Sequence, residues 1–266
     1  NAQSIITMYT VQALLGFGIT FLFIYTIFPD LFPGMGFALP LGFGLGPGQA
    51  FAICKNWEQF GFQGGGDVGL TFAAFGYLWD ILGGVFMINF GLRKGWLKGE
   101  SEANVDKIEV KTGVYGRGER LPIGARLTTE TEAVDSMTLN AAIVFGVYFL
   151  TYMLLVGITQ SMVEAGGALK DLAVNLWGIS FVFAALMALL IKKIMYILKV
   201  DHVLDNGTQT RLANTFVDIL VVAAIASISL VVVWRYLTPI VTLVLVTGIV
   251  TLFSVFWLVP RLFGDH

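Results

Sequence analysis

The sequence predicts an all-α, polytopic integral membrane protein. Hydrophobic residues make up 56% of the 266 residues and charged residues only 13%, whereas a soluble domain carries about 25% charged residues. The charges are also concentrated, because eight of the 16 Lys and Arg and eight of the 18 Asp and Glu lie between Arg93 and Asp135. The rest of the chain has too few charges to cover the surface of a soluble fold.

Six stretches with at most one charge are long enough to be transmembrane helices, which need about 20 residues. They are residues 5–28, 68–92, 137–163, 172–191, 212–234 and 236–260. The charged residues 93–136 separate the second stretch from the third. The chain therefore divides into a first transmembrane part (1–92), a linker (93–136) and a second transmembrane part (137–266).

Residues 31–54 are uncharged and long enough to cross a membrane, but their composition opposes a continuous helix. They contain Pro33, Pro40 and Pro47, together with six glycines between positions 34 and 48. Each proline removes a backbone donor, and each interior glycine weakens a helix by roughly 1 kcal/mol. We expect residues 41–48 to be non-helical and the whole segment to form a re-entrant hairpin, whose second half-helix starts near Gln49. A kinked spanning helix is the alternative.

The distribution of Lys and Arg predicts the orientation in the membrane. If the hairpin enters and leaves on one side, the linker 93–136, the loop 192–211 and the C-terminal end share the opposite face. These segments carry 13 Lys and Arg, against three on the other face. The positive-inside rule then places the linker 93–136 in the cytoplasm, and a bacterial inner membrane is the expected location. A spanning segment in place of the hairpin would give the same count.

The first and last predicted helices share a repeat with a spacing of 231 residues. Thr7, Thr20, Pro29, Leu31 and Phe32 recur as Thr238, Thr251, Pro260, Leu262 and Phe263. If the hairpin is re-entrant, the two helices point in opposite directions, as in the inverted repeats of secondary transporters. The first copy leads into the Gly-rich segment, whereas the second leads to Asp265 and His266. We therefore expect a second hairpin and a closing helix to follow.

The Gly-rich tip is the strongest candidate for a binding site. Glycines let the backbone approach a ligand closely, and proline suits the first turn of the helix that follows. The N–H groups at the start of that helix would favour an anionic group such as a carboxylate, while unwound carbonyl groups suit Na⁺. The predicted substrate-binding residues are Gly44, Gly46, Pro47, Gly48 and Gln49. A loop that serves only helix packing is the alternative.

Two carboxylates lie inside predicted helices. Asp80 is at the centre of its span, where a charge that faces lipid costs at least about 2.5 kcal/mol, so we expect it to face the bundle. We assign it to a coupling-cation or proton site and place Na⁺ at Gly44, Gly46 and Asp80. Asp218 lies about two turns into its helix and is the second candidate for ion coupling. For both carboxylates, a purely structural or interfacial role is the alternative.

The remaining polar residues predict no catalytic, metal-binding or nucleic-acid-binding site. Asn140, Thr151, Asn175 and Ser180 lie in apolar spans and are expected to form hydrogen bonds between helices. The two histidines and Cys54 form no cluster with metal-ligand spacing, and no nucleophile constellation is present, so we expect neither an enzyme nor a resident cofactor. The net charge of −2, with no basic patch outside the linker, disfavours binding to nucleic acid.

The segment Phe43-Gly-Leu-Gly-Pro-Gly-Gln-Ala50 resembles the re-entrant motif of the glutamate:sodium symporter family, which reads roughly Gly-Gly-His-Gly-Thr-Gly-Ala-Ala. Residues 75–84 are similar to that family's next helix, and residues 211–230 to a later one. The resemblance implies two inverted five-helix halves, each with a re-entrant hairpin, in a homodimer with elevator-type motion. It also implies that this chain lacks the first helices of one half and the last hairpin and helix of the other.

Three residues depart from the pattern of that family. Leu45 stands where the motif has His, Pro47 where it has Thr, and Asp80 where the family has a small residue. The resulting prediction is a sodium-coupled symporter of a small organic anion, glutamate or a related dicarboxylate, with Na⁺ as the coupling ion. An ion channel or passive pore that uses the Gly-rich loop as a filter is the alternative.

Overall fold

A computed structural model describes residues 2–93, 117 and 123–263, and all regular secondary structure within these residues is helical. Six of the helical segments are long and apolar enough to cross a membrane, which agrees with the predicted class of polytopic membrane protein. They are Ile5–Thr26, Gly65–Gly91, Ser136–Ala165, Ser180–Ile197, Asn206–Ser227 and Leu237–Trp257. Most of the predicted linker 93–136 lies outside the described residues.

Two of the predicted spans are wrong in their bounds. The stretch 172–191 is divided between α9 (Ala168–Gly178) and α10 (Ser180–Ile197). The stretch 212–234 is divided between α11 (Asn206–Ser227) and α12 (Leu230–Arg235). We predicted that each span ends where charged residues begin. Helices α10 and α11 instead include Lys192 and Arg211, because long basic side chains can reach water from inside a helix.

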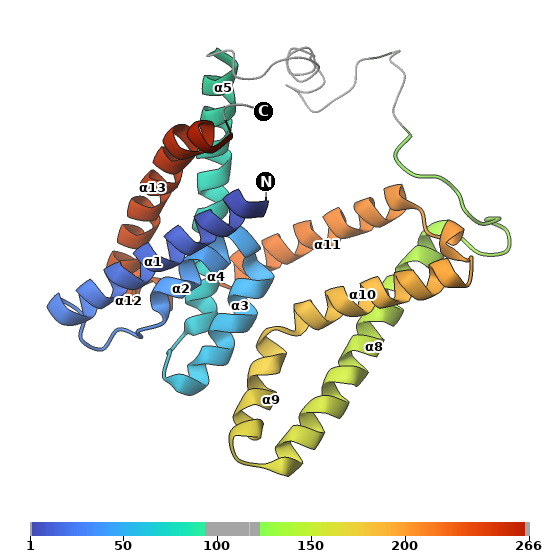
Figure 1. Cartoon of the computed structure of the whole chain (residues 1–266), viewed down its shortest axis with the longest axis horizontal. Helices are drawn as coiled ribbons and strands as arrows, with labels where there is room; N and C mark the ends of the chain where they lie inside the picture. The colour runs from blue at the N-terminus through green and yellow to red at the C-terminus, as the bar shows by residue number, and fades with distance from the viewer. Residues whose placement is uncertain (1, 94–116, 118–122, 264–266) are drawn as a thin grey trace.

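The helices form two groups, which Figure 1 shows side by side. The first contains α1 (Ala2–Thr26), α2 (Met35–Pro40), α3 (Pro47–Asn56), α4 (Gly65–Trp79), α5 (Val85–Arg93), α12 and α13 (Leu237–Phe263). The second contains α8 (Ser136–Ala165), α9 and α10. Helix α11 runs from the second group to the first and contacts α3, α4 and α8.

The buried core lies in the first group. It is built from apolar side chains of α2, α4 and α13 and of the connections next to them: Leu31, Met35, Leu39, Phe62, Phe72, Ile240 and Leu243. Two glycines let α1 and α2 approach closely, because a Cβ at Gly16 would collide with the backbone of Gly36. The core therefore depends on small residues at the α1–α2 contact as well as on large apolar side chains.

Helices α1 and α13 pack against each other in opposite directions. Gln12 of α1 donates a hydrogen bond from Nε2 to Thr251 Oγ1 of α13, at 3.1 Å. At the other end of the pair, residues 27–31 share a cavity of about 280 Å³ with Arg235, Tyr236 and Pro239. The antiparallel arrangement agrees with the predicted directions of the first and last helices.

Three buried polar atoms at the contact of α1, α4 and α13 have no hydrogen-bond partner among the described residues. They are Gln12 Oε1, Trp79 Nε1 and Thr247 Oγ1. A buried polar atom without a partner destabilises a fold by about 1–3 kcal/mol. The Thr247 hydroxyl therefore weakens this contact.

We expect Thr247→Val to raise the free energy of unfolding by about 1 kcal/mol, because valine keeps the shape and removes the unpaired hydroxyl. Thr20→Val is the matched control, since the buried Thr20 hydroxyl donates to the Gly16 carbonyl at 2.8 Å, and its loss should destabilise the fold. Thermal unfolding of the two variants in detergent compares them. Destabilisation by Thr247→Val would contradict the prediction.

Aspartates cap the N-termini of two long helices, α8 and α11. Asp135 precedes α8 and accepts hydrogen bonds from the Thr138 N–H and hydroxyl, at 2.8 and 3.0 Å. Asp205 precedes α11 and accepts from the Thr208 N–H and hydroxyl, at 2.7 and 2.9 Å. These hydrogen bonds, the backbone one first, hold the pKa of both carboxyl groups below the ordinary value of 3.8.

A carboxylate with a lowered pKa stabilises the fold fully above its ordinary pKa, and the effect is lost as the pH falls through the lowered value. We therefore expect Asp205→Ala to lower the melting temperature at pH 7, with a difference from the natural protein that narrows at pH values below 3.8. Asp201→Ala is the control, because Asp201 caps no long helix. A difference independent of pH would contradict a charge-based cap.

The predicted polar residues differ in the hydrogen bonds that they make. Asn175 of α9 accepts from the Asn56 Nδ2 of α3 at 2.8 Å, which confirms a bond between helices. Asn140 of α8 accepts from the backbone N–H of Asp205 at 3.3 Å. The prediction is wrong for Thr151, whose hydroxyl donates to the Val147 carbonyl of its own helix.

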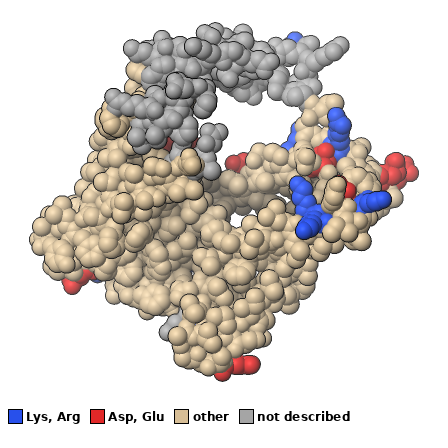
Figure 2. Space-filling model, in the orientation of Figure 1, with Lys and Arg blue, Asp and Glu red and all other residues tan. Residues whose placement is uncertain are grey.

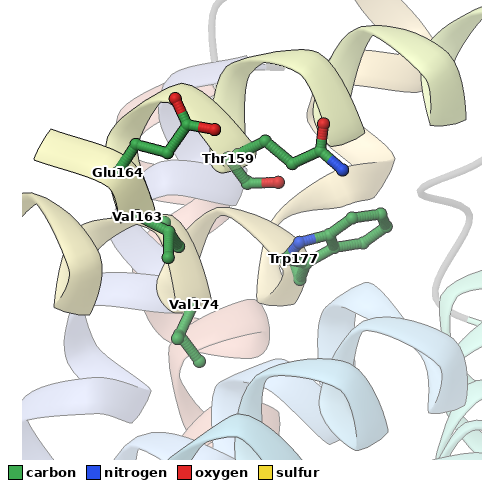
Figure 3. Close-up of a pocket in the computed structure, with 7 residues that line it drawn as sticks. Thr159, Val163, Glu164, Val174 and Trp177 are labelled. Atoms are coloured by element: carbon green, nitrogen blue, oxygen red, sulfur yellow. The ribbon is translucent and has the colours of Figure 1, made fainter.

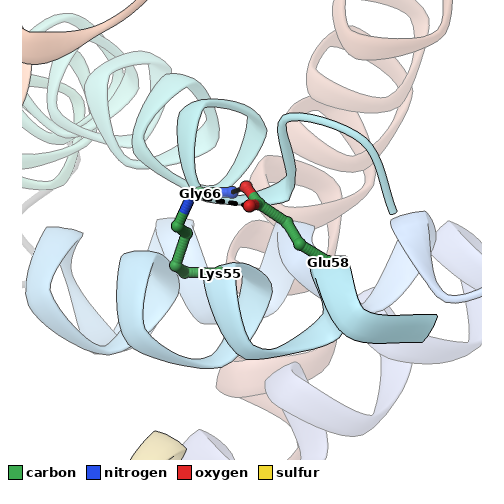
Figure 4. Close-up of polar contacts among 3 residues, drawn as sticks. All are labelled: Lys55, Glu58 and Gly66. Atoms are coloured by element: carbon green, nitrogen blue, oxygen red, sulfur yellow. Dashed lines mark hydrogen bonds and ion pairs between the residues drawn. The ribbon is translucent and has the colours of Figure 1, made fainter. Parts of the chain in front are cut away.

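The turn between α3 and α4 is held by one carboxylate, as Figure 4 shows. Glu58 pairs with Lys55 at 2.6 Å and accepts from the Gly66 N–H at 3.2 Å. The Gly66 N–H lies in the first turn of α4, where backbone donors have no partner within the helix. Glu58 therefore fixes the start of α4, the helix that leads to Asp80.

Candidate functional site

The Gly-rich segment forms two short helices on either side of one broken position. Helix α2 continues into a π-helical turn, η1 (Leu41–Leu45), Gly46 breaks the helix, and α3 begins at Pro47. The prediction of a non-helical stretch 41–48 is therefore wrong except at Gly46. Gly46 has φ 97° and ψ 175°, a conformation that is essentially restricted to glycine.

The two ends of this segment come together. The Phe32 ring, before α2, stacks on Phe62 with 4.6 Å between ring centroids and lies 6.1 Å from the Trp57 ring, just after α3. Both α2 and α3 also pack against α4. The chain therefore passes along α2 to Gly46 and returns along α3 toward the place where the segment began, as the ribbon in Figure 1 shows.

The break leaves backbone polar groups free at the tip. The last four carbonyl groups of a helical segment and its first N–H groups have no partner within the helix, so the unpaired carbonyl groups belong to residues 42–45. Gly48 and Gln49 lie in the first turn of α3, and Pro47 has no N–H to satisfy. The tip thus presents a partly negative carbonyl end and a partly positive N–H end next to each other.

A cavity of about 270 Å³ brings the tip and Asp80 together. Its walls come from η1, from Gly46 and from one face of α4, and Asp80 stands at the end of that face. The lining residues are Gly42, Phe43, Gly44, Leu45, Gly46, Ala73, Gly76, Tyr77 and Asp80. Three predicted sodium ligands, Gly44, Gly46 and Asp80, therefore share one cavity.

Asp80 begins a second π-helical turn, η3 (Asp80–Gly84), between α4 and α5. Asp80 is an exposed residue that lines the cavity, whereas we expected its side chain to face the helix bundle. The nearest atom to a Cβ at Gly84 would be Asp80 Oδ1, at 3.3 Å. Gly84 thus leaves space beside the carboxylate, which keeps it accessible to a ligand.

Two tyrosines of the site were not among the predicted residues. Tyr77 lines the cavity, and its hydroxyl oxygen would lie 3.9 Å from a Cβ at Gly46. Tyr9 of α1 occupies the space beside Gly44, with its hydroxyl oxygen 2.6 Å from the position of a Cβ there. Tyr77 precedes Asp80 by three residues and so shares its helical face, a spacing that could have identified it.

The other predicted site residues lie outside this cavity. Gly48 faces α11, where a Cβ would lie 3.2 Å from Leu220 Cδ2. Gln49 Oε1 is 3.7 Å from the Cβ position of Gly46, but neither Gln49 nor Pro47 lines the cavity. Asp218 is an exposed residue of α11 and is also absent from the lining.

A second cavity of about 440 Å³ lies between α8 and α9 and is shown in Figure 3. It is lined by Thr159, Gln160, Val163, Glu164, Ala173, Val174 and Trp177. It contains none of the predicted site residues. Within the described residues, no group of three or more His, Cys, Asp or Glu is placed to hold a metal ion.

Comparison of this chain with protein-family models, with curated proteins and with solved structures found no match. The resemblance to glutamate:sodium symporters therefore remains a prediction from the sequence. The tip of the broken helix and Asp80 are the features from which we infer a function.

Proposed function

We propose that this protein is a sodium-coupled secondary transporter of a small organic anion, glutamate or a related dicarboxylate. The observation that carries the proposal is the cavity that joins the tip of a broken helix to Asp80. Broken helices that expose free backbone groups at membrane depth are typical of the ion and substrate sites of such transporters. The proposal treats residues 31–54 as a re-entrant hairpin.

The charges around the cavity favour a cation. The carbonyl end of η1 carries partial negative charge, and the Asp80 carboxylate adds a full negative charge on the opposite wall. Oxygen ligands of this kind suit Na⁺ and would repel a second carboxylate. In this proposal, Na⁺ binds at Gly44, Gly46 and Asp80, and the Tyr77 hydroxyl is a further oxygen ligand.

The anionic substrate belongs on the other side of the tip, at the start of α3. The free N–H groups of Gly48 and Gln49 attract a carboxylate, and they lie next to the carbonyl end that attracts the cation. Bound Na⁺ would lower the cost of bringing an anion to the adjacent N–H groups, and the anion would strengthen Na⁺ binding equally. This reciprocity is the physical basis of coupled transport.

The packing of α1 on α13 supports an inverted repeat. The hydrogen bond between Gln12 and Thr251 and the cavity that residues 27–31 share with Arg235, Tyr236 and Pro239 make the two helices run in opposite directions. Two helices related by an inverted repeat must run in opposite directions.

We place the protein in a bacterial inner membrane with the linker 93–136 in the cytoplasm, as a homodimer with elevator-type motion. Figure 2 shows Lys and Arg gathered at the end where α10 ends and α11 begins, which supports a cytoplasmic location of that end.

Uptake of labelled glutamate by proteoliposomes that contain the full-length protein tests this function. Accumulation above the external concentration under an inward Na⁺ gradient, and none without it, is the expected result. Unlabelled dicarboxylates and hydroxy acids as competitors identify the substrate class. Flux that only equilibrates would indicate a channel, and the absence of flux for every anion tested would overturn the proposal.

A further inference from the structure

A third cavity, of about 470 Å³, opens between α8, α10 and α11. Its walls are almost entirely aliphatic, and its polar groups come from Lys192 and Gln209. The lining residues are Ile143, Val144, Val147, Ala185, Ala188, Leu189, Ile191, Lys192, Met195, Leu204 and Gln209. All three helices are candidate membrane spans, so the apolar walls lie where lipid chains are the surrounding solvent.

The lining of this cavity includes residues next to the connection between α10 and α11, namely Met195, Leu204 and Gln209. Lys192 lies five residues before the end of α10 at Ile197, which is about 8 Å along a helix, so its ammonium group can extend to the membrane surface. Lys193, Lys199 and Arg211 lie close to Lys192 in the sequence, and Figure 2 shows Lys and Arg gathered where α10 ends and α11 begins.

No carboxylate of the described residues forms an ion pair with Lys192. Asp201 and Asp205 are the nearest acidic residues in the sequence, and the Asp205 carboxylate already accepts the two hydrogen bonds from Thr208. The cavity thus combines apolar walls with the positive charge of Lys192, which forms no ion pair with a carboxylate of the described residues. An anionic group on an apolar chain would satisfy both.

We propose that this cavity binds an acidic phospholipid of the surrounding bilayer, with an acyl chain between α8 and α10 and the phosphate at Lys192. Basic pockets between transmembrane helices recognise anionic lipid headgroups in this way. The volume is within the range of cavities that hold small ligands. The bilayer supplies the chain directly to a cavity that opens between its spanning helices. This site is independent of the proposed transport function.

The test measures phospholipid bound to the purified full-length protein by native mass spectrometry, with phosphatidylglycerol and phosphatidylcholine of identical acyl chains. We expect the natural protein to retain phosphatidylglycerol in preference to phosphatidylcholine. Lys192→Gln should weaken phosphatidylglycerol binding roughly tenfold, because one charge-assisted bond to phosphate is lost. Lys193→Gln is the matched control, since Lys193 is exposed on the same helix and does not line the cavity.

A second pair of variants tests the apolar part of the site and leaves every charge in place. Ala188→Phe fills the cavity and should reduce phosphatidylglycerol binding, whereas Leu190→Phe, at an exposed position outside the lining, should not. Equal losses for Lys192→Gln and Lys193→Gln would overturn the proposal in favour of general surface charge. Binding of free palmitate in place of phosphatidylglycerol, or equal binding of both phospholipids, would also overturn it.

Discussion

Asp80→Asn is expected to weaken sodium-driven uptake of the substrate strongly. The amide keeps the size of the side chain but removes the only full negative charge among the residues that line the cavity at the tip. Loss of one charged ligand at such an exposed site costs about 1.5–3 kcal/mol, which corresponds to roughly tenfold to a hundredfold in the affinity for Na⁺. The measurement is the Na⁺ concentration that gives half-maximal uptake in proteoliposomes.

Asp218→Asn is the matched control for that experiment. It changes the same functional group in the same way, but Asp218 is exposed on α11 and lies outside the cavity. We expect its Na⁺ dependence to stay within about threefold of the natural protein, which is under 1 kcal/mol. A loss with Asp218→Asn as large as that with Asp80→Asn would show that the cavity is not the only ion site. Unchanged coupling in Asp80→Asn would remove the proposed role of this cavity.

Gly16→Ala should destabilise the fold by about 3 kcal/mol or abolish folding. Its new methyl group would collide with the backbone of Gly36, and a backbone atom in a packed helix cannot move aside as a flexible side chain does. The clash separates α1 from α2 and so disturbs the path of the chain into the tip. Thermal unfolding in detergent and the yield of monodisperse protein measure the effect.

Gly18→Ala provides the comparison within the same helix. A Cβ at Gly18 would meet nothing within 4 Å, and alanine is favoured over glycine in a helix by up to about 1 kcal/mol. We therefore expect Gly18→Ala to stabilise the protein slightly. Equal destabilisation by both variants would mean that α1 tolerates no alanine for reasons unrelated to the contact with α2.

The sequence predicted the class of protein because charge-poor composition is a property of the whole chain. Six long apolar helices are present in the part of the chain that the structure describes, and the predicted ends of α1, α8 and α13 are close to those observed. Ends defined by charges failed for α10 and α11. Lys192 and Arg211 lie inside these helices, and the capping side chain of Asp205 extends α11 further toward its N-terminus than hydropathy indicates.

The site could be predicted where a single residue type determines the geometry. Gly46 must be glycine at its backbone angles, and the cost of a carboxylate in a membrane span identified Asp80. Tyr9 could not be found in this way, because its place beside Gly44 depends on how α1 crosses the tip. The helical turn at residues 41–45 was missed because a glycine's weak preference against helix is outweighed by packing against α4.

The hydrogen bond between Asn56 and Asn175 joins α3 of the first helix group to α9 of the second. If one group slides past the other during a transport cycle, this bond must break each time. A typical hydrogen bond contributes about 0.5–1.5 kcal/mol net, so the bond would slow the departure from this state by roughly twofold to tenfold. This hydrogen bond would then prolong the lifetime of the conformation in which it forms, without changing which ligands the protein binds.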